Sequence, residues 1–169
     1  MQAPRRAYIG LGANLGDARA ALRASVQALA ALPGTRLVAL SSLYRTAPID
    51  SSGPDYFNAV AAIDTDIEPP ALLQALQAIE LAHGRERPYR NAPRTLDLDL
   101  LLHGDAVLDT PTLTLPHPRI AQRAFVLRPL AELAPGLLLP GHGHLDTLLP
   151  AVADQRIERC AGPDWASVP

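Results

Sequence analysis

The chain contains no lysine, because all fifteen of its basic residues are arginine. A Schiff-base mechanism and a P-loop nucleotide site both depend on a lysine side chain, so the composition excludes both. A single cysteine, Cys160, excludes an intramolecular disulfide and is typical of a reducing compartment. No apolar run reaches membrane-spanning length, and a net charge of -2 favours neither nucleic acid nor anionic membranes. We therefore expect a cytoplasmic protein that binds neither nucleic acid nor a membrane.

Aromatic residues are also scarce, at 4% of a chain whose hydrophobic content is 48%. The core must therefore be built from leucine, alanine, valine and isoleucine. A length of 169 residues is enough for one domain with a real core and short for two. We expect a single domain over residues 1–169, in which the segment after about residue 150 has no assigned role.

Hydrophobic periodicity and turn residues predict an α+β fold with the element order β-α-β-β-α-β. This is the ferredoxin-like pattern, with helices packed on a mainly antiparallel sheet. Further short strands within 106–115 and a third helix over 124–133 are expected as C-terminal additions. The predicted core elements are a strand over 7–13, a helix from the N-cap Asp17 to Leu32, strands over 37–44 and 56–63, a helix from Pro69 to about His83, and a strand that ends near Leu102.

Three glycines lie in the last part of the first predicted strand and just after it, with the spacing G-x-G-x-x-x-G from Gly10 to Gly16. This spacing is one residue longer than the dinucleotide-binding fingerprint, and the order of elements does not continue as β-α-β-α-β. We therefore predict a tight strand-to-helix turn at these glycines, and not a dinucleotide site.

The segment Arg94–Leu102 alternates apolar and acidic residues and then continues as an apolar run. Residues i and i+2 of a strand point to one face, so Asp97 and Asp99 should project side by side. Two adjacent carboxylates repel each other, and a hard cation such as Mg²⁺ would offset that cost. The alternative is a solvated edge strand with acidic residues. The leucines from Leu98 onward favour a central strand, and with it the metal site.

Four arginines, Arg85, Arg87, Arg90 and Arg94, precede these carboxylates with only Glu86 to oppose them. An arginine cluster beside a pair of metal-binding carboxylates is the arrangement expected for a polyphosphate ligand. The prolines at positions 88 and 93 indicate a loop that closes over a bound nucleotide. Without this loop position, a charge run of this kind would normally be just a solvated face.

Other polar residues have two interpretations each. Tyr56 and Asn58 share one face of a strand and could stack on and read a planar heterocycle, or could be a core tyrosine with a structural amide. His117, held between two prolines, could donate to a phosphate or lie in a surface turn. Gln77 and Glu80 share an edge of the second helix, and the sequence alone favours ordinary surface residues.

Together these segments resemble the 6-hydroxymethyl-7,8-dihydropterin pyrophosphokinase family of folate biosynthesis, over about residues 7–149. The motifs that carry the resemblance are YIGLGANLGD from Tyr8, SLYRTAP from Ser42, PDYFN from Pro54, Ile79-Glu80, Gly84-Arg85, PRTLDLD from Pro93, LPHPR from Leu115 and RAF from Arg123. Their number and their order make chance agreement very improbable.

The resemblance implies a transferase that moves the pyrophosphoryl group of ATP to the pterin hydroxymethyl group and releases AMP. It implies small-molecule substrates only, and we expect a monomer. Two Mg²⁺ ions would be held by Asp97 and Asp99, which with Arg94 and Arg85 form the catalytic set. The pterin would be bound by Thr46, Pro48, Tyr56, Asn58 and Phe125, and ATP by Gln77, Glu80, Arg85, Arg87, Arg94, His117 and Arg123.

The sequence departs from some relatives at three places. Asn91 stands where some relatives carry a tryptophan, so stacking from that position is absent. Thr112 and Pro118 stand where some relatives carry arginine and tyrosine, which changes the nucleotide contacts expected there.

Two other functions fit parts of the pattern. A nucleotidyltransferase with an Asp-x-Asp strand on a ferredoxin-like core would release pyrophosphate instead of AMP. A regulatory module of the same fold would bind a small molecule without catalysis, but it would need neither paired carboxylates nor an arginine cluster.

Overall fold

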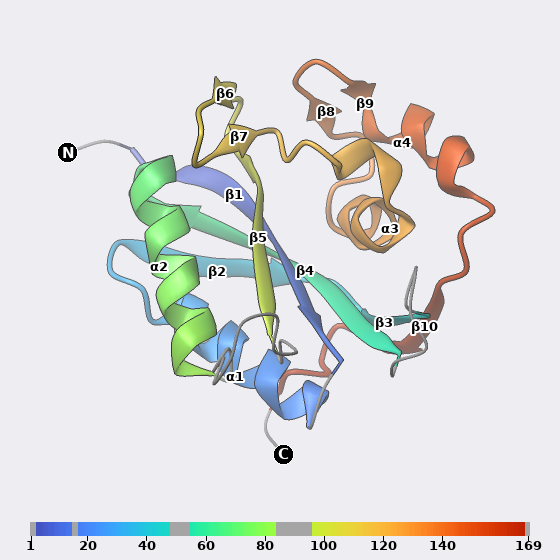
Figure 1. Ribbon diagram of the computed structural model, residues 1–169, viewed down its shortest axis with the longest axis horizontal. Helices are drawn as coiled ribbons and strands as arrows, with labels where there is room; N and C mark the ends of the chain where they lie inside the picture. Colours follow the sequence, from blue (N-terminus) through green and yellow to red (C-terminus); the bar gives the residue numbers. More distant parts are fainter. Residues whose placement is uncertain (1–2, 15–16, 48–54, 84–95, 168–169) are drawn as a thin grey trace.

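The computed structural model describes residues 3–14, 17–47, 55–83 and 96–167. Its centre is a six-stranded sheet in the order β10-β3-β4-β1-β5, with β2 also paired to β4 (Figure 1). All the pairings within this sheet are antiparallel. No helix in the described ranges is long and apolar enough to cross a membrane.

The element order confirms the ferredoxin-like prediction, and the third predicted helix, over 124–133, is confirmed at both ends. The core elements are β1 Arg5–Ala13, α1 Ala18–Ala30, β2 Thr35–Leu40, β3 Leu43–Thr46, β4 Tyr56–Thr65, α2 Pro69–Ala82 and β5 Asp97–His103. The C-terminal additions are β6 Leu108–Asp109, β7 Thr114–Leu115, α3 Ala124–Leu133, β8 Leu138–Leu139, β9 Gly143–His144, α4 Leu145–Leu148 and β10 Glu158–Ala161, with 3₁₀ turns at Ile120–Gln122 and Leu149–Val152. The N-cap prediction is also confirmed, since Asp17 Oδ1 accepts from Ala20 N at 3.1 Å.

The strand predicted over 37–44 is two strands, β2 and β3, which both pair with β4. At the break, Ser41 Oγ accepts from Val60 N at 2.9 Å, and Trp165 Nε1 donates to the Ser41 carbonyl at 2.8 Å. Ser42 N donates to the Glu132 carboxylate at 3.0 Å. Side chains thus take over backbone hydrogen bonds at this point, which lets the strand bend.

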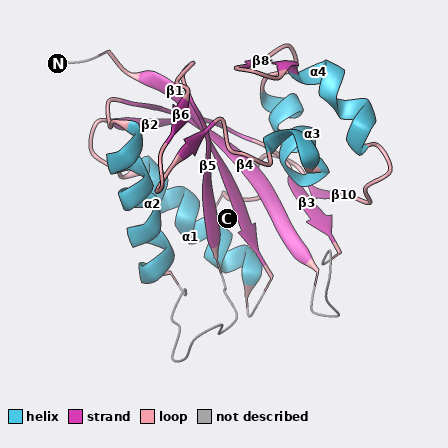
Figure 2. Ribbon diagram, turned by 45° about the horizontal axis from the view of Figure 1, so that its top comes forward, coloured by secondary structure: helices cyan, strands magenta, loops and turns pink. Residues whose placement is uncertain are grey.

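Two hydrophobic cores cover the two faces of the sheet. Along β1, Ala7, Ile9 and Leu11 pack against α1 and α2, whereas Tyr8 belongs to the core beneath α3. Figure 2 shows α1 and α2 on one side of the sheet and α3 and α4 on the other. The alternation along β1 follows from the period of two in a strand, and it leaves Gly10 and Gly12 on the α3 side.

Strand β5 was predicted to be central, but it ends the path of hydrogen-bonded strands and pairs only with β1 among the described residues. Its leucines are buried because layers cover both of its faces. Leu98 and Leu100 belong to the core beneath α1 and α2, and Leu101 and Leu102 to the core beneath α3. Leucines along a strand therefore indicate that both faces of the strand are covered, but they do not indicate that both of its edges are paired with other strands.

Helix α3 is fixed to the sheet by one carboxylate. Glu132 accepts from the Ser42 hydroxyl and the Tyr44 hydroxyl, each at 2.8 Å, in addition to Ser42 N. Burial and the bond to Glu132 raise the pKa of Tyr44 to about 12. Burial acts to raise the pKa of Glu132, but the hydrogen bonds from Ser42 and Tyr44 outweigh it and lower that pKa. The C-terminal end of α3 is thereby tied to β3.

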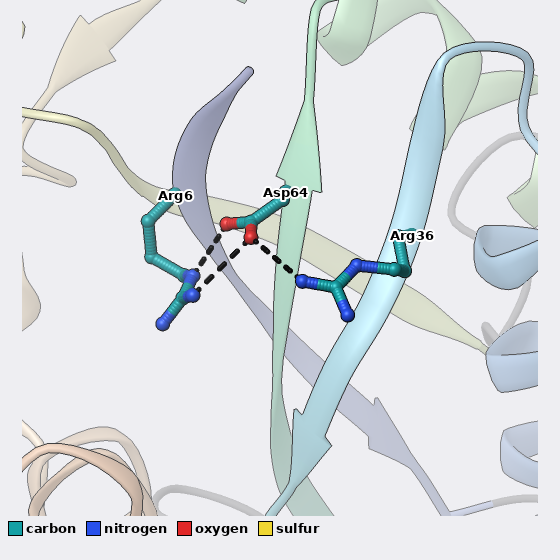
Figure 3. Close-up of polar contacts among 3 residues, drawn as sticks. All are labelled: Arg6, Arg36 and Asp64. Atoms are coloured by element: carbon teal, nitrogen blue, oxygen red, sulfur yellow. Dashed lines mark hydrogen bonds and ion pairs between the residues drawn. The ribbon is translucent and has the colours of Figure 1, made fainter.

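At the far end of the sheet, Asp64 on β4 lies directly opposite Arg6 on β1 and Arg36 on β2. Arg6 Nε donates to Asp64 Oδ1 at 2.6 Å, and Arg36 Nη2 reaches Asp64 Oδ2 at 3.4 Å (Figure 3). The hydrogen bond from Arg6 is the main reason that the pKa of Asp64 is lowered. These ion pairs link three neighbouring strands.

Asp64→Asn is expected to lower the unfolding free energy by roughly 0.5–1 kcal/mol at pH 7, because the pairs are partly exposed. Since the folded pKa of Asp64 lies below the unfolded value of about 4, its contribution is present above that pH and is lost as the pH falls further. Urea unfolding of both proteins is measured from pH 7 down to about pH 2.5, which lies below the usual range of carboxylate pKa values. The difference in unfolding free energy should shrink as the pH falls. Asp109→Asn, at an exposed position, is the control. A constant difference at every pH would contradict the prediction.

Candidate active site

A cavity of about 590 Å³ lies on the α3 face of the sheet. Its walls come from segments far apart in the sequence: the ends of β1 and β3, the starts of β4 and β5, the start of α3, and the C-terminal segment. The predicted site residues that line it are Thr46, Tyr56, Asn58, Asp97, Asp99, Arg123 and Phe125. The fold therefore brings most of the predicted pterin residues together with the predicted metal ligands.

The floor of the cavity contains Gly10 and Gly12. Both lie inside β1, within the strand predicted over 7–13, and the strand-to-helix turn predicted at the end of that strand includes Gly16. A Cβ atom at position 12 would lie 3.1 Å from Asn58 Oδ1, closer than side chains normally pack. At position 10 it would lie 3.7 Å from the Cβ of Asp99. The missing side chains keep open the space between Asn58 and the carboxylates. The third glycine, Gly16, is outside the described residues.

The predicted side-by-side placement of the carboxylates agrees with the sheet register. Asp97 lies opposite Gly12 and Asp99 opposite Gly10 on β1, and both carboxylates border the cavity. Each is neither fully buried nor fully exposed. Paired carboxylates that face open space on one side supply the oxygen ligands that Mg²⁺ prefers. In the described ranges, no group of three or more His, Cys, Asp or Glu side chains could hold a metal ion. A metal here would thus take its remaining ligands from substrate or water.

Asn58 is only 5% exposed and faces the cavity beside Thr46. Its Nδ2 donates to Thr46 Oγ1 at 3.0 Å, which fixes the orientation of the amide. Because strand β3 pairs with β4 here, with Tyr44 opposite Asn58, the two polar groups are held by the sheet itself. This leaves an oriented amide oxygen and a hydroxyl at one end of the cavity.

At the other side, α3 presents Arg123 and Phe125 to the cavity. The Arg123 guanidinium carbon lies 5.3 Å from the centroid of the Phe125 ring, within the range of a cation–π contact. Arg123 was predicted to bind ATP, and it lies in the same cavity as the predicted pterin residues. The site therefore combines an aromatic ring with a cation.

A second cavity, of about 270 Å³, adjoins β5 and the loop around β6 and β7. It contains His117, and also Thr112 and Pro118, the positions that differ from some relatives. Asp99 borders both cavities. The two cavities therefore share one wall residue of the carboxylate pair, Asp99.

Burial lowers the pKa of His117, and Arg123 and Arg119 lower it further, while Asp99 acts in the opposite direction. A lowered pKa favours the neutral form of the ring. His117 Nδ1 accepts from Arg119 N at 3.2 Å, so the proton is assigned to Nε2. A neutral imidazole with one N–H can donate a hydrogen bond to a ligand in this cavity.

Two predicted nucleotide residues on α2 behave differently from each other. Gln77 is exposed and borders neither cavity. The sequence favoured a surface position for Glu80 as well, which is wrong, since it is 5% exposed. Its Oε2 accepts from Leu98 N at 2.8 Å, between the two aspartates of β5. On the same edge of α2, Gln77 is exposed to solvent and Glu80 is buried against β5. The predicted site residues Pro48, Arg85, Arg87 and Arg94 lie outside the described residues.

Several cavity residues were not predicted from the sequence. Gln122 precedes α3, and Gln155 and Arg156 come from the C-terminal segment. Isolated polar residues before a helix or in a proline-rich and glycine-rich tail give no pattern. The return of the tail to the sheet through β10 brings Gln155 and Arg156 here. No sequence signal distinguished them.

Comparison with known proteins gives a consistent result. The family model described as 7,8-dihydro-6-hydroxymethylpterin-pyrophosphokinase (HPPK) matches residues 8–135. The chain is 50% identical to the 2-amino-4-hydroxy-6-hydroxymethyldihydropteridine pyrophosphokinase of Pseudomonas aeruginosa, over 94% of this chain and 98% of that protein. It is 48% identical to the Methylorubrum extorquens protein of the same name, over 80% of this chain and 87% of that one.

Among solved structures, wild-type Plasmodium falciparum HPPK-DHPS is similar with a TM-score of 0.70 and 13% sequence identity. The match covers 87% of this chain but only 44% of the Plasmodium chain, so this chain spans less than half of that protein. At this identity the likeness supports the fold alone. The family match and the two bacterial relatives go further: the chain belongs to the 7,8-dihydro-6-hydroxymethylpterin-pyrophosphokinase family.

Proposed function

We propose that the two cavities that meet at Asp99 are the active site of this enzyme, with the pterin in the larger cavity and the phosphates of ATP toward the smaller one. As a member of its family, the chain is a pyrophosphokinase of folate biosynthesis that transfers pyrophosphate to a hydroxymethyldihydropterin. The observation that carries the assignment is that Asp99 borders both spaces. A group transferred between the two ligands would pass beside this carboxylate.

In the larger cavity, Tyr56 and Phe125 are assigned to the two faces of the pterin ring. Asn58 and Thr46 are assigned to its polar edge. The support is the composition of the walls, in which two aromatic rings accompany one oriented amide and one hydroxyl. Planar heterocycles with several donors and acceptors are bound by stacking combined with amide hydrogen bonds.

Near the carboxylates, Asp97 and Asp99 are assigned as the ligands of two Mg²⁺ ions. Bound there, the ions would neutralise phosphate charge, a role that Mg²⁺ has in phosphoryl transfer generally. Phosphate oxygens are assigned to two donors: Arg123, which borders the larger cavity, and the Nε2–H of His117, which borders the smaller one. The assignments of Gln77 and Glu80 to ATP, and those of Pro48, Arg85, Arg87 and Arg94, stay predictions.

Attack of a primary alcohol on phosphorus depends on alignment and on neutralised charge more than on a strong base. The residues of this chain serve the first requirement by holding the pterin between two rings, with its edge fixed by Asn58. They serve the second through the Arg123 guanidinium and the neutral His117 donor. The product of ATP would then be AMP.

The proposal also includes the domain organisation, the cellular location and the oligomeric state. A single pyrophosphokinase domain over residues 1–169 is supported by β10, which joins the tail to the same sheet as the N-terminal strands. The cytoplasmic location and the monomeric state stay predictions from the sequence.

Product analysis tests the proposed reaction. The enzyme is incubated with Mg²⁺, ATP and 6-hydroxymethyl-7,8-dihydropterin, and the nucleotides are separated by chromatography. We expect AMP and the pterin diphosphate in equal amounts. Release of pyrophosphate with a nucleotide attached to the pterin would instead support the nucleotidyltransferase alternative.

Asn58→Ala is expected to weaken pterin binding by roughly 1–3 kcal/mol, because a buried polar edge of the ligand loses its partner. The affinity for a non-hydrolysable ATP analogue should stay the same, since Asn58 does not border the smaller cavity. Equilibrium binding of each ligand by calorimetry measures both values. Equal losses for the two ligands would mean that Asn58 supports the fold and does not bind the pterin.

A further inference from the structure

The C-terminal segment returns to the larger cavity after the end of the family match at residue 135. It passes beside α3 and then joins the sheet as β10 (Figure 1). Gln155 and Arg156, between the last 3₁₀ turn and β10, line the cavity. Residues outside the matched region therefore form part of the wall of the site.

The Gln155 side chain makes two hydrogen bonds to the start of α3. Its Oε1 accepts from Ala124 N and its Nε2 donates to the Gln122 carbonyl, both at 2.8 Å. The N-cap residue of this helix, Arg123, makes no capping hydrogen bond with its own side chain. Gln155 thus satisfies the first unpaired N–H of α3 from 31 residues away, in place of a local cap.

These two bonds hold the backbone on either side of Arg123 and directly before Phe125. The same short backbone stretch sets the position of both side chains, which contact each other and face the cavity. The segment that carries Gln155 is in turn fixed three residues later, where Glu158 lies opposite Arg45 on β3. Gln155 therefore connects the start of α3 to the strand that also carries Thr46.

We propose that Gln155 is a positioning residue for the pterin: its amide holds the 122–125 backbone so that Phe125 faces the bound ring. The inference rests on the proposed assignment of the larger cavity to the pterin. Gln155 borders that cavity and not the smaller one, so its larger effect falls on the pterin. A smaller effect on ATP is expected through Arg123, which the same two hydrogen bonds flank.

Gln155→Ala is expected to raise the pterin KM and the pterin dissociation constant roughly tenfold, the equivalent of one or two lost hydrogen bonds. The KM for ATP should rise less, by about two- to threefold, because Arg123 is held by the same backbone stretch but Gln155 does not border the smaller cavity. Gln155→Glu keeps the acceptor for Ala124 N, at a helix N-terminus where negative charge is favourable, but it cannot donate to the Gln122 carbonyl. It should therefore recover only part of the lost affinity. Steady-state kinetics and calorimetric pterin binding measure both variants.

Asp154→Ala, at the exposed neighbouring position outside the cavity, is the matched control, and its kinetics should be those of the wild type.

Asn58→Ala is assayed in parallel, because a normal pterin KM in that variant would reject the cavity assignment itself. If Asn58→Ala raises the pterin KM and Gln155→Ala does not, only the role of Gln155 is rejected. Equal increases for both substrates would also reject it, since a purely structural role predicts them. If Gln155→Ala does not fold, Gln155→Asn replaces it, and its shorter side chain should raise the pterin KM more than the ATP KM.

Discussion

Asp97→Ala and Asp99→Ala should each lower kcat by about three orders of magnitude or more, in a protein that remains folded. Both carboxylates border the larger cavity, and Asp99 also borders the smaller one. Each is assigned to hold Mg²⁺ at the point where the phosphates would meet the pterin hydroxyl. Loss of either ligand would remove charge neutralisation where negative charge accumulates in the transition state. Initial rates of AMP formation at saturating substrates measure the effect.

Asp105→Ala, at an exposed position in the turn after β5, is the control and should retain normal activity. Without Mg²⁺, the unfolding free energies of the two site variants should stay within about 1 kcal/mol of the wild type, because removal of one carboxylate relieves repulsion. The wild type should lose activity with EDTA and regain it with Mg²⁺. Turnover by either site variant near the wild-type rate would reject the metal assignment.

The placement of Asp97 and Asp99 on one face could be predicted because alternation along a strand is a local property of the backbone. For the same reason, the N-cap Asp17 and the limits of α3 follow from short stretches of sequence. The position of β5 in the sheet could not be predicted this way. Its leucines are buried by layers that come from other parts of the chain, and burial alone does not specify which strands are neighbours.

Residues that act through long-range contacts were missed or misassigned. Gly10 and Gly12 were given no part in the site, because only the partner strands of β1 show that Asn58 and the carboxylates flank them. Gln155 had no sequence signal, since its partners lie more than thirty residues away. In each case the decisive fact is which distant backbone groups the side chain meets. Local patterns carry no information about those contacts.

Glu80 gives the second large effect that we expect. Its carboxylate is buried under β5 and accepts from Leu98 N, the backbone group between the two aspartates. Glu80→Ala should lower the unfolding free energy by roughly 1–3 kcal/mol, because a buried N–H loses its partner. It should also lower kcat by about 10- to 100-fold, since small displacements of catalytic groups are costly in rate. Urea unfolding and steady-state kinetics measure the two effects.

Glu80→Gln separates the hydrogen bond from the charge. The glutamine keeps a carbonyl oxygen that can accept from Leu98 N, so stability and kcat should both stay close to the wild type. Gln74→Ala, at an exposed position on the same helix outside both cavities, should change neither value. Suppose instead that Glu80→Gln loses as much activity as Glu80→Ala while remaining as stable as the wild type. The charge of Glu80 would then matter to catalysis directly, beyond the ATP binding that the resemblance implies, and its support of β5 would be secondary.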